Sequence, residues 1–287
     1  MRVSALAVLL AIAACAGPSP RFDLDARELG FDREEVAGAG FMHAVYRARL
    51  TAPANRLHVY LEGDGTPWIG GRHAALDPTP RSPVALRLMT RDPGPALLLG
   101  RPCYHGHYAD AGCGPALWTD ARYSEAVVAS MVRALEAVRA PGARLTLIGH
   151  SGGGTLAMLL AERVAGVDAV VTIAGNLDVA AWTRRHDYEP LAASLDPSAR
   201  APLPPHIRQI HFAGERDREV PPQLVAAAAR RQPGARFELR PGFDHACCWL
   251  RDWPGLLAST VASPESASLR AAYLPPITRV ESDAQSR

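Results

Sequence analysis

The sequence predicts an α/β fold built on a largely parallel sheet, and three observations carry this prediction. Short apolar runs alternate along the chain with longer amphipathic runs, which is the pattern of strands joined by crossover helices. One apolar run ends in a glycine-flanked serine, and a helix-like stretch follows it at once. In residues 124–140 the apolar side chains recur at helical spacing, namely Val127, Val128, Met131, Leu135 and Val138. We therefore expect a doubly wound sheet with helices on both faces.

The expected elements follow one another in a regular order. The strands are expected at residues 44–50, 56–61, 95–100, 144–148, 169–174, 207–213 and 236–239. The helices are expected at residues 83–90, 124–140, 153–164, 222–231 and 254–262. A short helix near 176–186 would belong to a possible small cap formed by residues 175–206.

Length and composition limit the class of protein. The chain has 287 residues, of which 48% are hydrophobic, enough for one large domain with a sizeable core. We expect this domain to span residues 41–262, followed by a loosely held tail over 263–287. The net charge of +2 argues against a nucleic-acid partner.

The N-terminus predicts export. Met1 and Arg2 are followed by an apolar run from Val3 to Ala14, which is too short to span a bilayer and suits a signal peptide over residues 1–14. The run ends in Ile-Ala-Ala-Cys15, which resembles a bacterial lipobox and implies cleavage before Cys15 and lipidation of its thiol. An ordinary signal peptide cut near Ala14 is the alternative.

A lipidated N-terminus places the protein at the cell envelope. Ala16 after the cysteine resembles outer-membrane sorting, so we expect a lipoprotein that faces the periplasm. Residues 15–40 would then be a lipid-anchored tether and lead-in, with the tether itself over residues 17–27. The membrane is thus an expected partner, through Cys15.

The segment from Leu145 to Gly154 has the form of a nucleophile elbow, Gly-x-Ser-x-Gly. A strand must reverse sharply into a helix there, and a Cβ on Gly149 or Gly153 would clash with the neighbouring strand or helix. Ser151 would project its Oγ beyond the sheet at the positive end of a helix dipole. The N–H of Gly152 is then placed to receive an oxyanion.

A serine hydroxyl needs a base to take its proton and an acid to orient that base. Asp217 is our candidate for the acid, because it lies in a turn directly after the strand expected at 207–213; Glu215 and Glu219 are the alternatives. His245 is our candidate for the base, because it follows Asp217 and lies in a loop after the last strand.

A second oxyanion donor is expected after the strand at 56–61. This strand runs into Gly63-Asp64-Gly65, a turn that lets main-chain N–H groups face the site. Asp64 or Gly65 would supply the donor. Trp68 and Trp182 are candidate walls of a substrate pocket, or ordinary packing residues.

These segments together resemble the α/β-hydrolase superfamily over about residues 45–257. The resemblance rests on the elbow, the oxyanion loop, the Gly-x-x-Asp-x-x-Val-Pro turn at 214–221 and the Gly-Phe-x-His segment at 242–245. The segments at 101–104 and 118–124 look like a less characterised bacterial lipoprotein branch of it. The oxyanion loop reads Glu-Gly-Asp-Gly, where better-known lipases have His-Gly-Gly-Gly.

The resemblance implies a serine hydrolase with the order Ser151, Asp217, His245. Such an enzyme would cleave a small-molecule ester or thioester through an acyl-enzyme, and no metal or organic cofactor is implied. A peptidase or amidase with the same residues is one alternative. A non-catalytic envelope lipoprotein that uses the fold for binding is another.

Export also favours disulfides among the remaining cysteines. Cys103 and Cys113 bracket a loop of suitable length, whereas Cys247 and Cys248 are adjacent. Four cysteines allow three pairings. We expect the pairs Cys103–Cys113 and Cys247–Cys248.

A metal site is the competing interpretation of the first cysteine pair. Cys103, His105, His107 and Cys113 are chemically suitable ligands for zinc. Their spacing matches no standard zinc motif, so we expect no metal.

Overall fold

The computed structural model describes residues 17–48 and 55–261. The predicted signal peptide, Cys15 and the predicted tail lie outside these residues. Within them, no helix combines the length and the apolar character needed to cross a bilayer.

An eight-stranded sheet organises the molecule, with the spatial order β1-β2-β6-β3-β7-β8-β9-β10. The main-sheet strands are β1 Phe31–Ala37, β2 Met42–Ala48, β3 Arg56–Leu61, β6 Ala96–Leu99, β7 Arg144–His150, β8 Val167–Ile173, β9 Arg208–Gly214 and β10 Arg236–Arg240. The pairs from β6 to β10 are parallel, whereas β1–β2 and β2–β6 are antiparallel. The predicted, largely parallel sheet is confirmed.

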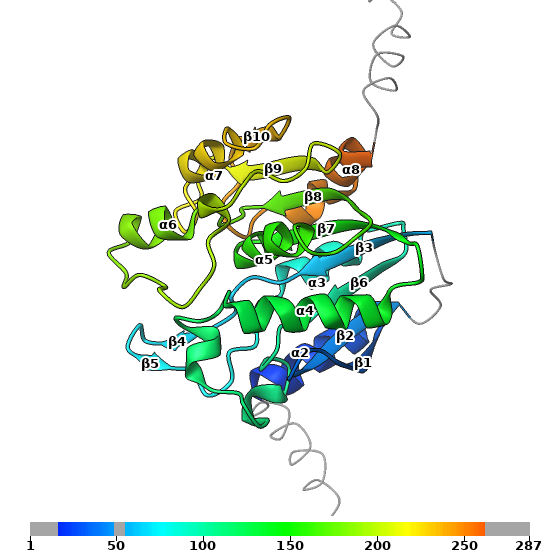
Figure 1. Cartoon of the computed structure of the whole chain (residues 1–287), viewed down its shortest axis with the longest axis vertical. Coiled ribbons are helices and arrows are strands. Elements are labelled where there is room, and N and C mark those ends of the chain that lie inside the picture. Colours follow the sequence, from blue (N-terminus) through cyan, green and yellow to red (C-terminus); the bar gives the residue numbers. More distant parts are fainter. Residues whose placement is uncertain (1–16, 49–54, 262–287) are drawn as a thin grey trace, which may run out of the picture.

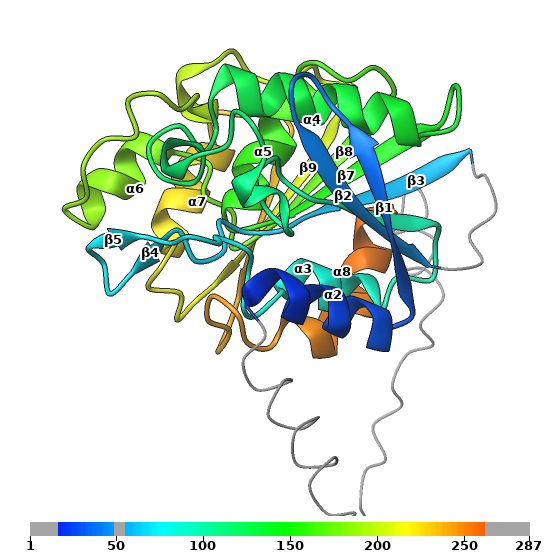
Figure 2. The ribbon, with the colours of Figure 1, turned by 90° about the horizontal axis from the view of Figure 1, so that it is seen from below.

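Helices cover both faces of the sheet (Figures 1 and 2). The helices are α2 Pro18–Glu28, α3 Val84–Met89, α4 Glu125–Val138, α5 Gly152–Ala161, α6 Val179–Arg185, α7 Pro222–Ala229 and α8 Trp249–Val261. Figure 2 shows α4 and α5 on one face and α2, α3 and α8 on the other. Short 3₁₀ helices are η1 His107–Ala109, η2 Pro115–Trp118 and η3 Pro197–Ala199.

The strands feed two hydrophobic layers because successive side chains point to opposite faces. In β7, Leu145 and Leu147 pack with the layer of α4 and α5, whereas Ile148 packs with the layer of α3 and α8. Both layers are fully buried at these positions. Because the strands from β6 to β10 run parallel, their carboxyl ends lie at one edge of this buried sheet.

The expected tether is wrong for the described residues. Residues 18–28 form α2, and residues 31–37 form β1, which pairs with β2. Phe22 and Ala26 of α2 are each 1% exposed and pack in the second layer beside Tyr46. The burial of these two apolar side chains stabilises the helix, although the polar composition of the segment had suggested a free linker.

Two further elements differ from expectation. Helix α8 begins at Trp249 rather than at Pro254, which lies inside it. Trp249 and Trp253 are completely buried, so packing of these two rings sets the start of the helix. A small hairpin of β4 Trp68–Ile69 and β5 His73–Ala74 was not expected; Figure 1 shows it and α6 projecting beyond the same end of the sheet.

Candidate functional site

Ser151 stands at the sharp turn between β7 and α5. Its backbone has φ 53° and ψ −122°, a conformation that is costly for a residue with a side chain. Main-chain hydrogen bonds hold it from both sides: its N–H donates to Ile173 at 3.0 Å, and its carbonyl accepts from Gly154 at 2.9 Å and Asn176 at 3.0 Å. The surrounding structure therefore enforces the strained position of the serine.

The glycines two positions before and after Ser151 lie close to neighbouring main-chain atoms, as the sequence predicted. A Cβ on Gly149 would lie 2.2 Å from the carbonyl oxygen of Gly153. A Cβ on Gly153 would lie 2.1 Å from the carbonyl oxygen of Leu61 in β3. Both neighbours are main-chain atoms, so neither position has room for a side chain. The prediction is confirmed at both glycines.

Asp217 and His245 are brought together in a hydrogen bond. The Nδ1 of His245 lies 2.9 Å from the Oδ2 of Asp217. The other oxygen, Oδ1, accepts the N–H groups of Glu219 and Val220, both at 2.9 Å. These bonds fix the carboxylate, which is 4% exposed as a residue. The alternative carboxylate of Glu215 instead accepts the N–H of Gly242 at 2.9 Å.

The loop that carries His245 is held by residues that the sequence analysis missed. The Oδ1 of Asp244 accepts the N–H groups of Ala246 and Cys247 at 2.9 and 2.7 Å. The indole of Trp249 donates to the carbonyl of Asp244 at 3.1 Å. An aspartate followed by a tight loop is the signal of an Asx turn, which would have identified Asp244.

His150 supports the His245 loop from below. Its Nε2 lies 2.9 Å from the carbonyl oxygen of His245, and the two rings are 4.9 Å apart. A carbonyl oxygen only accepts, so we assign the hydrogen to Nε2. Burial, followed by the nearby His245, lowers the pKa of His150 to about 3, so the ring is neutral. The residue preceding Ser151 thus contacts the residue proposed as its base.

The loop after β3 lies directly against Ser151. A Cβ on Gly63 would be 3.3 Å from the Cβ of Ser151. Gly65 turns away, with φ +68°, and its Cβ would meet the carbonyl oxygen of Pro78 at 2.1 Å. Within the described part of the chain, the N–H groups of Asp64 and Gly152 have no hydrogen-bond acceptor. Of the two predicted donor residues, Asp64 follows the glycine that lies against Ser151, and its carboxylate lies against Gly152.

Trp182 lies in α6 and ties this helix to the loop of Asp217. Its indole N–H donates to the carbonyl of Glu219 at 2.8 Å, and the Nε2 of His186 lies 2.9 Å from the same oxygen. His186 in turn stacks on Tyr188, with ring centres 5.3 Å apart. Trp182, His186 and Tyr188 thus form a cluster of rings at helix α6, in the region of the expected cap, which we call the aromatic lobe.

Trp68 has a different environment. It lies on β4 in the projecting hairpin and is 43% exposed. The described residues place no ring of another residue against its indole. The ring contacts of Trp182 within the described residues are with His186 and Tyr188, so the joint pocket wall of Trp68 and Trp182 stays a prediction.

Both expected disulfides are formed. Cys103 and Cys113 are bridged with their Cα atoms 5.5 Å apart, and Cys247 is bridged to Cys248. The first bridge occupies both thiols of the alternative zinc site. His105 packs its ring 4.5 Å from that of Phe22, so the four residues do not form one ligand set.

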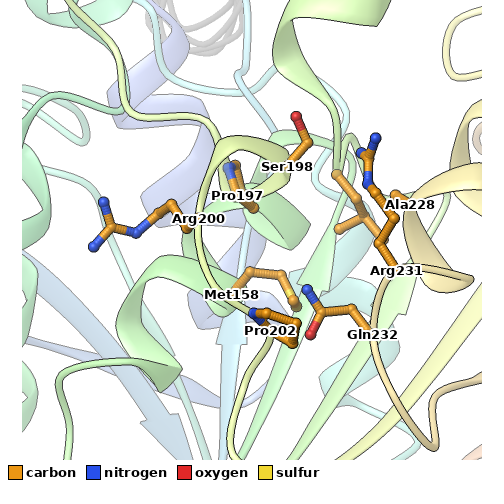
Figure 3. Close-up of a pocket in the computed structure, with 9 residues that line it drawn as sticks. Met158, Pro197, Ser198, Arg200, Pro202, Ala228, Arg231 and Gln232 are labelled. Carbon is orange, nitrogen blue, oxygen red and sulfur yellow. The ribbon is translucent and has the colours of Figure 1, made fainter.

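A cavity of about 230 Å³ lies away from the three candidate residues, between α5, α7 and η3. Its floor is apolar and includes Met158 and Pro202, and Figure 3 shows the side chain of Arg200 extending away from it. Arg200 and Arg231 pair with Glu162 and Asp178. The cavity is therefore separate from the site around Ser151.

No protein-family model matches the chain, and no curated protein matches it. Solved structures do match. An α/β serine hydrolase homologue from Coxiella burnetii is 14% identical, with a TM-score of 0.53, over 80% of this chain and 97% of that one. A serine hydrolase without a lid from Xanthomonas campestris is 13% identical, with a TM-score of 0.52, over 82% and 97%.

A puromycin-hydrolysing peptidase of Mycobacterium tuberculosis gives a third match. It is 17% identical, with a TM-score of 0.55, over 81% of this chain and 39% of the peptidase. At these identities the likeness concerns the fold and not the substrate. The chain therefore has the fold of the α/β serine hydrolases.

Proposed function

We propose that the protein is a serine hydrolase that cleaves a carboxylic ester or thioester through an acyl-enzyme. The observation that carries the proposal is the 2.9 Å hydrogen bond between His245 and Asp217, at the sheet edge where Ser151 is held in a strained conformation. A carboxylate bound to Nδ1 fixes the imidazole tautomer and leaves Nε2 as the base. An Asp–His pair at the sheet edge that carries a nucleophile elbow supports a mechanism in which the histidine activates the serine hydroxyl.

The proposed reaction has two halves. His245 takes the proton from the hydroxyl of Ser151 while Oγ bonds to the substrate carbonyl carbon. The N–H groups of Gly152 and Asp64 hold the resulting oxyanion. When the intermediate collapses, the bond to the leaving oxygen or sulfur breaks and that atom takes the proton from His245. Water then attacks the acyl group by the same route, which releases the acid and restores the serine.

The kind of bond that is cleaved is a separate part of the proposal. One structural neighbour is a puromycin-hydrolysing peptidase, and the same groups can cleave an amide. Esters and thioesters carry better leaving groups and react with fewer demands on the acid step. A substrate panel therefore includes all three bond types, with esters expected to react fastest.

Labelling with a fluorophosphonate probe tests the proposal. The protein without its first 16 residues is expected to take up the probe, whereas Ser151→Ala and His245→Ala are not, because the first lacks the nucleophile and the second the base. Two controls, Ser259→Ala and His206→Ala, change side chains away from the site and are expected to label normally. A folded parent protein that takes no probe, or a Ser151→Ala variant that labels as the parent does, would contradict the proposal.

We further propose that the chain reaches the cell envelope as a lipoprotein anchored at Cys15. The lipobox-like sequence supports this, and the two disulfides are typical of proteins in oxidising compartments. Labelled palmitate is expected to enter the full chain in a bacterial host and to be absent from Cys15→Ser. Equal incorporation in both would rule out this anchor.

A further inference from the structure

A buried cluster of charged side chains lies beside the nucleophile elbow, and the reaction described above does not use it. Asp64 is its centre. Arg101 donates from Nη2 to Oδ1 of Asp64 at 2.7 Å, and Arg122 donates from Nη1 to Oδ2 at 3.0 Å. The hydroxyl of Tyr123 donates to the same carboxylate at 2.6 Å. The side chains of the two arginines are only 4% and 5% exposed.

This cluster touches the residue that follows the nucleophile. A Cβ on Gly152 would lie 2.0 Å from the Oδ1 of Asp64 and 2.4 Å from the hydroxyl of Tyr123. The carboxylate and the hydroxyl therefore rest on the Cα of Gly152, in the space where any other residue would place its side chain. One oxyanion donor belongs to Asp64 itself, and the other belongs to the residue that its carboxylate contacts.

The main chain of Asp64 is held from the same side. The hydroxyl of Tyr104 donates to the carbonyl of Asp64 at 3.0 Å. Tyr104 lies between Cys103 and His105, which have φ values of 66° and 54°. Left-handed residues with side chains on both sides of Tyr104 are costly, and such strain is found where a precise position is needed. The disulfide from Cys103 to Cys113 closes this segment.

The charges also favour an oxyanion at this place. Burial alone would raise the pKa of Asp64, but Arg101 and Arg122 outweigh it and lower the pKa to about 2. Two guanidinium groups thus face one ionised carboxylate, and a surplus of positive charge remains. Burial raises the pKa of the neighbouring Glu62 to about 7, so this carboxyl offsets little of the surplus in weakly acidic solution. Among the described residues, Nε and Nη1 of Arg101 are buried without a hydrogen-bond acceptor, and the guanidinium carbon lies 5.6 Å and 5.4 Å from the ring centres of Tyr104 and Tyr123.

We propose that Asp64 is a positioning residue of the oxyanion hole, which Arg101, Arg122 and Tyr123 hold against Gly152. The inference rests on the proposed serine-hydrolase function. It assigns a role to the segments Arg101–Tyr104 and Arg122–Tyr123. An ion pair that served stability alone would not need to lie beside the nucleophile.

The opposite edge of the sheet provides a matched control. Asp168 is 5% exposed and also has two arginine partners, Arg56 at 2.6 Å and Arg144 at 2.9 Å. It lies at the start of β8, whereas Ser151 follows the end of the neighbouring β7. Asp168→Asn likewise removes a carboxylate charge that pairs with two arginines, whose side chains are here 45% and 62% exposed, without touching the oxyanion hole.

The test compares Asp64→Asn with Asp168→Asn, using a p-nitrophenyl ester and the fluorophosphonate probe. Asp64→Asn is expected to lower kcat about 100-fold while KM changes little, because a misplaced donor weakens binding of the transition state more than that of the substrate. The probe is expected to react more slowly by a similar factor. Asp168→Asn is expected to keep the kcat of the parent protein.

A milder variant keeps the test decisive if Asp64→Asn does not fold. Tyr123→Phe removes only the hydroxyl that rests on Gly152 and is expected to lower kcat about tenfold at constant KM. Parent-like labelling and kcat in Tyr123→Phe and in a folded Asp64→Asn would overturn the inference and leave the proposed function intact. An equal fall of kcat in Asp168→Asn would also overturn it. A parent protein that never labels would overturn the proposed function itself.

Discussion

Asp217→Asn is expected to lower kcat about 10⁴-fold, the loss typical of a catalytic acid whose partner histidine takes the wrong tautomer. The amide can still occupy the place of the carboxylate, whose Oδ1 accepts two N–H groups from Glu219 and Val220. It cannot stabilise the charged imidazole of His245 as an anion 2.9 Å away does. The measurement is steady-state hydrolysis of an ester, with circular dichroism to verify the fold.

Two neighbouring carboxylates provide the controls for this variant. Glu215 accepts the N–H of Gly242, and only the main chain of Glu219 bonds to the carboxylate of Asp217. Glu215→Gln and Glu219→Gln are therefore expected to keep kcat within a few-fold of the parent. If either falls as far as Asp217→Asn, or if Asp217→Asn stays active, then the acid has been assigned to the wrong residue.

Acidification is expected to lower the unfolding free energy steeply below pH 6.5. Burial lowers the pKa of His43 and His211 to about 4 and that of His105 and His150 to about 3. The unfolded chain takes up these protons near pH 6.5, whereas the folded chain does so only near pH 4 or 3. The contribution of the four buried histidines to the unfolding free energy is therefore complete above pH 6.5. It is lost as the pH falls, by up to about 1.4 kcal/mol per pH unit for each histidine.

Glu62 acts with the opposite sign. Burial raises its pKa from 4.5 to about 7, so the folded chain keeps a proton that the unfolded chain has released. Its contribution is complete below pH 4.5 and is lost as the pH rises toward 7. Between pH 4.5 and about 7, the proton on Glu62 cancels the effect of about one of the four histidines. The unfolding free energy therefore still rises with pH, by up to about 4 kcal/mol per pH unit.

Urea unfolding at about pH 7, 6 and 5 measures this slope. His211→Gln removes one buried imidazole and is expected to reduce the slope by about one proton. The side chain of His206 is exposed, so His206→Gln is expected to leave the slope as it is. An unfolding free energy that does not change over this range would refute the expectation.

The sequence predicted the parts of the fold that depend on local pattern. Helix α4 followed from its apolar spacing, and both disulfides followed from spacing and adjacency together with the expectation of export. The elbow glycines followed from the sterics of a strand that turns into a helix. In each case the deciding contact lies close in sequence or repeats regularly, so one segment contains the information.

The parts that escaped prediction depend on distant contacts. Helix α2 is polar in composition and is fixed by Phe22 and Ala26, which pack against residues of the sheet. Asp64 was recognised only for its main-chain N–H, because its side-chain partners come from Arg101, Arg122 and Tyr123, at least 37 positions away. Nothing local in the sequence indicates that the ring of His150 supports the loop of His245.

The carbonyl of Glu219 links the aromatic lobe to the loop that carries Asp217. Trp182 and His186 both bond to this oxygen, and the N–H of the same residue bonds to Asp217. Helix α6 cannot swing outward without breaking two hydrogen bonds or pulling the loop of the acid with it. Any outward movement of the lobe is therefore coupled to the position of the carboxylate that orients His245.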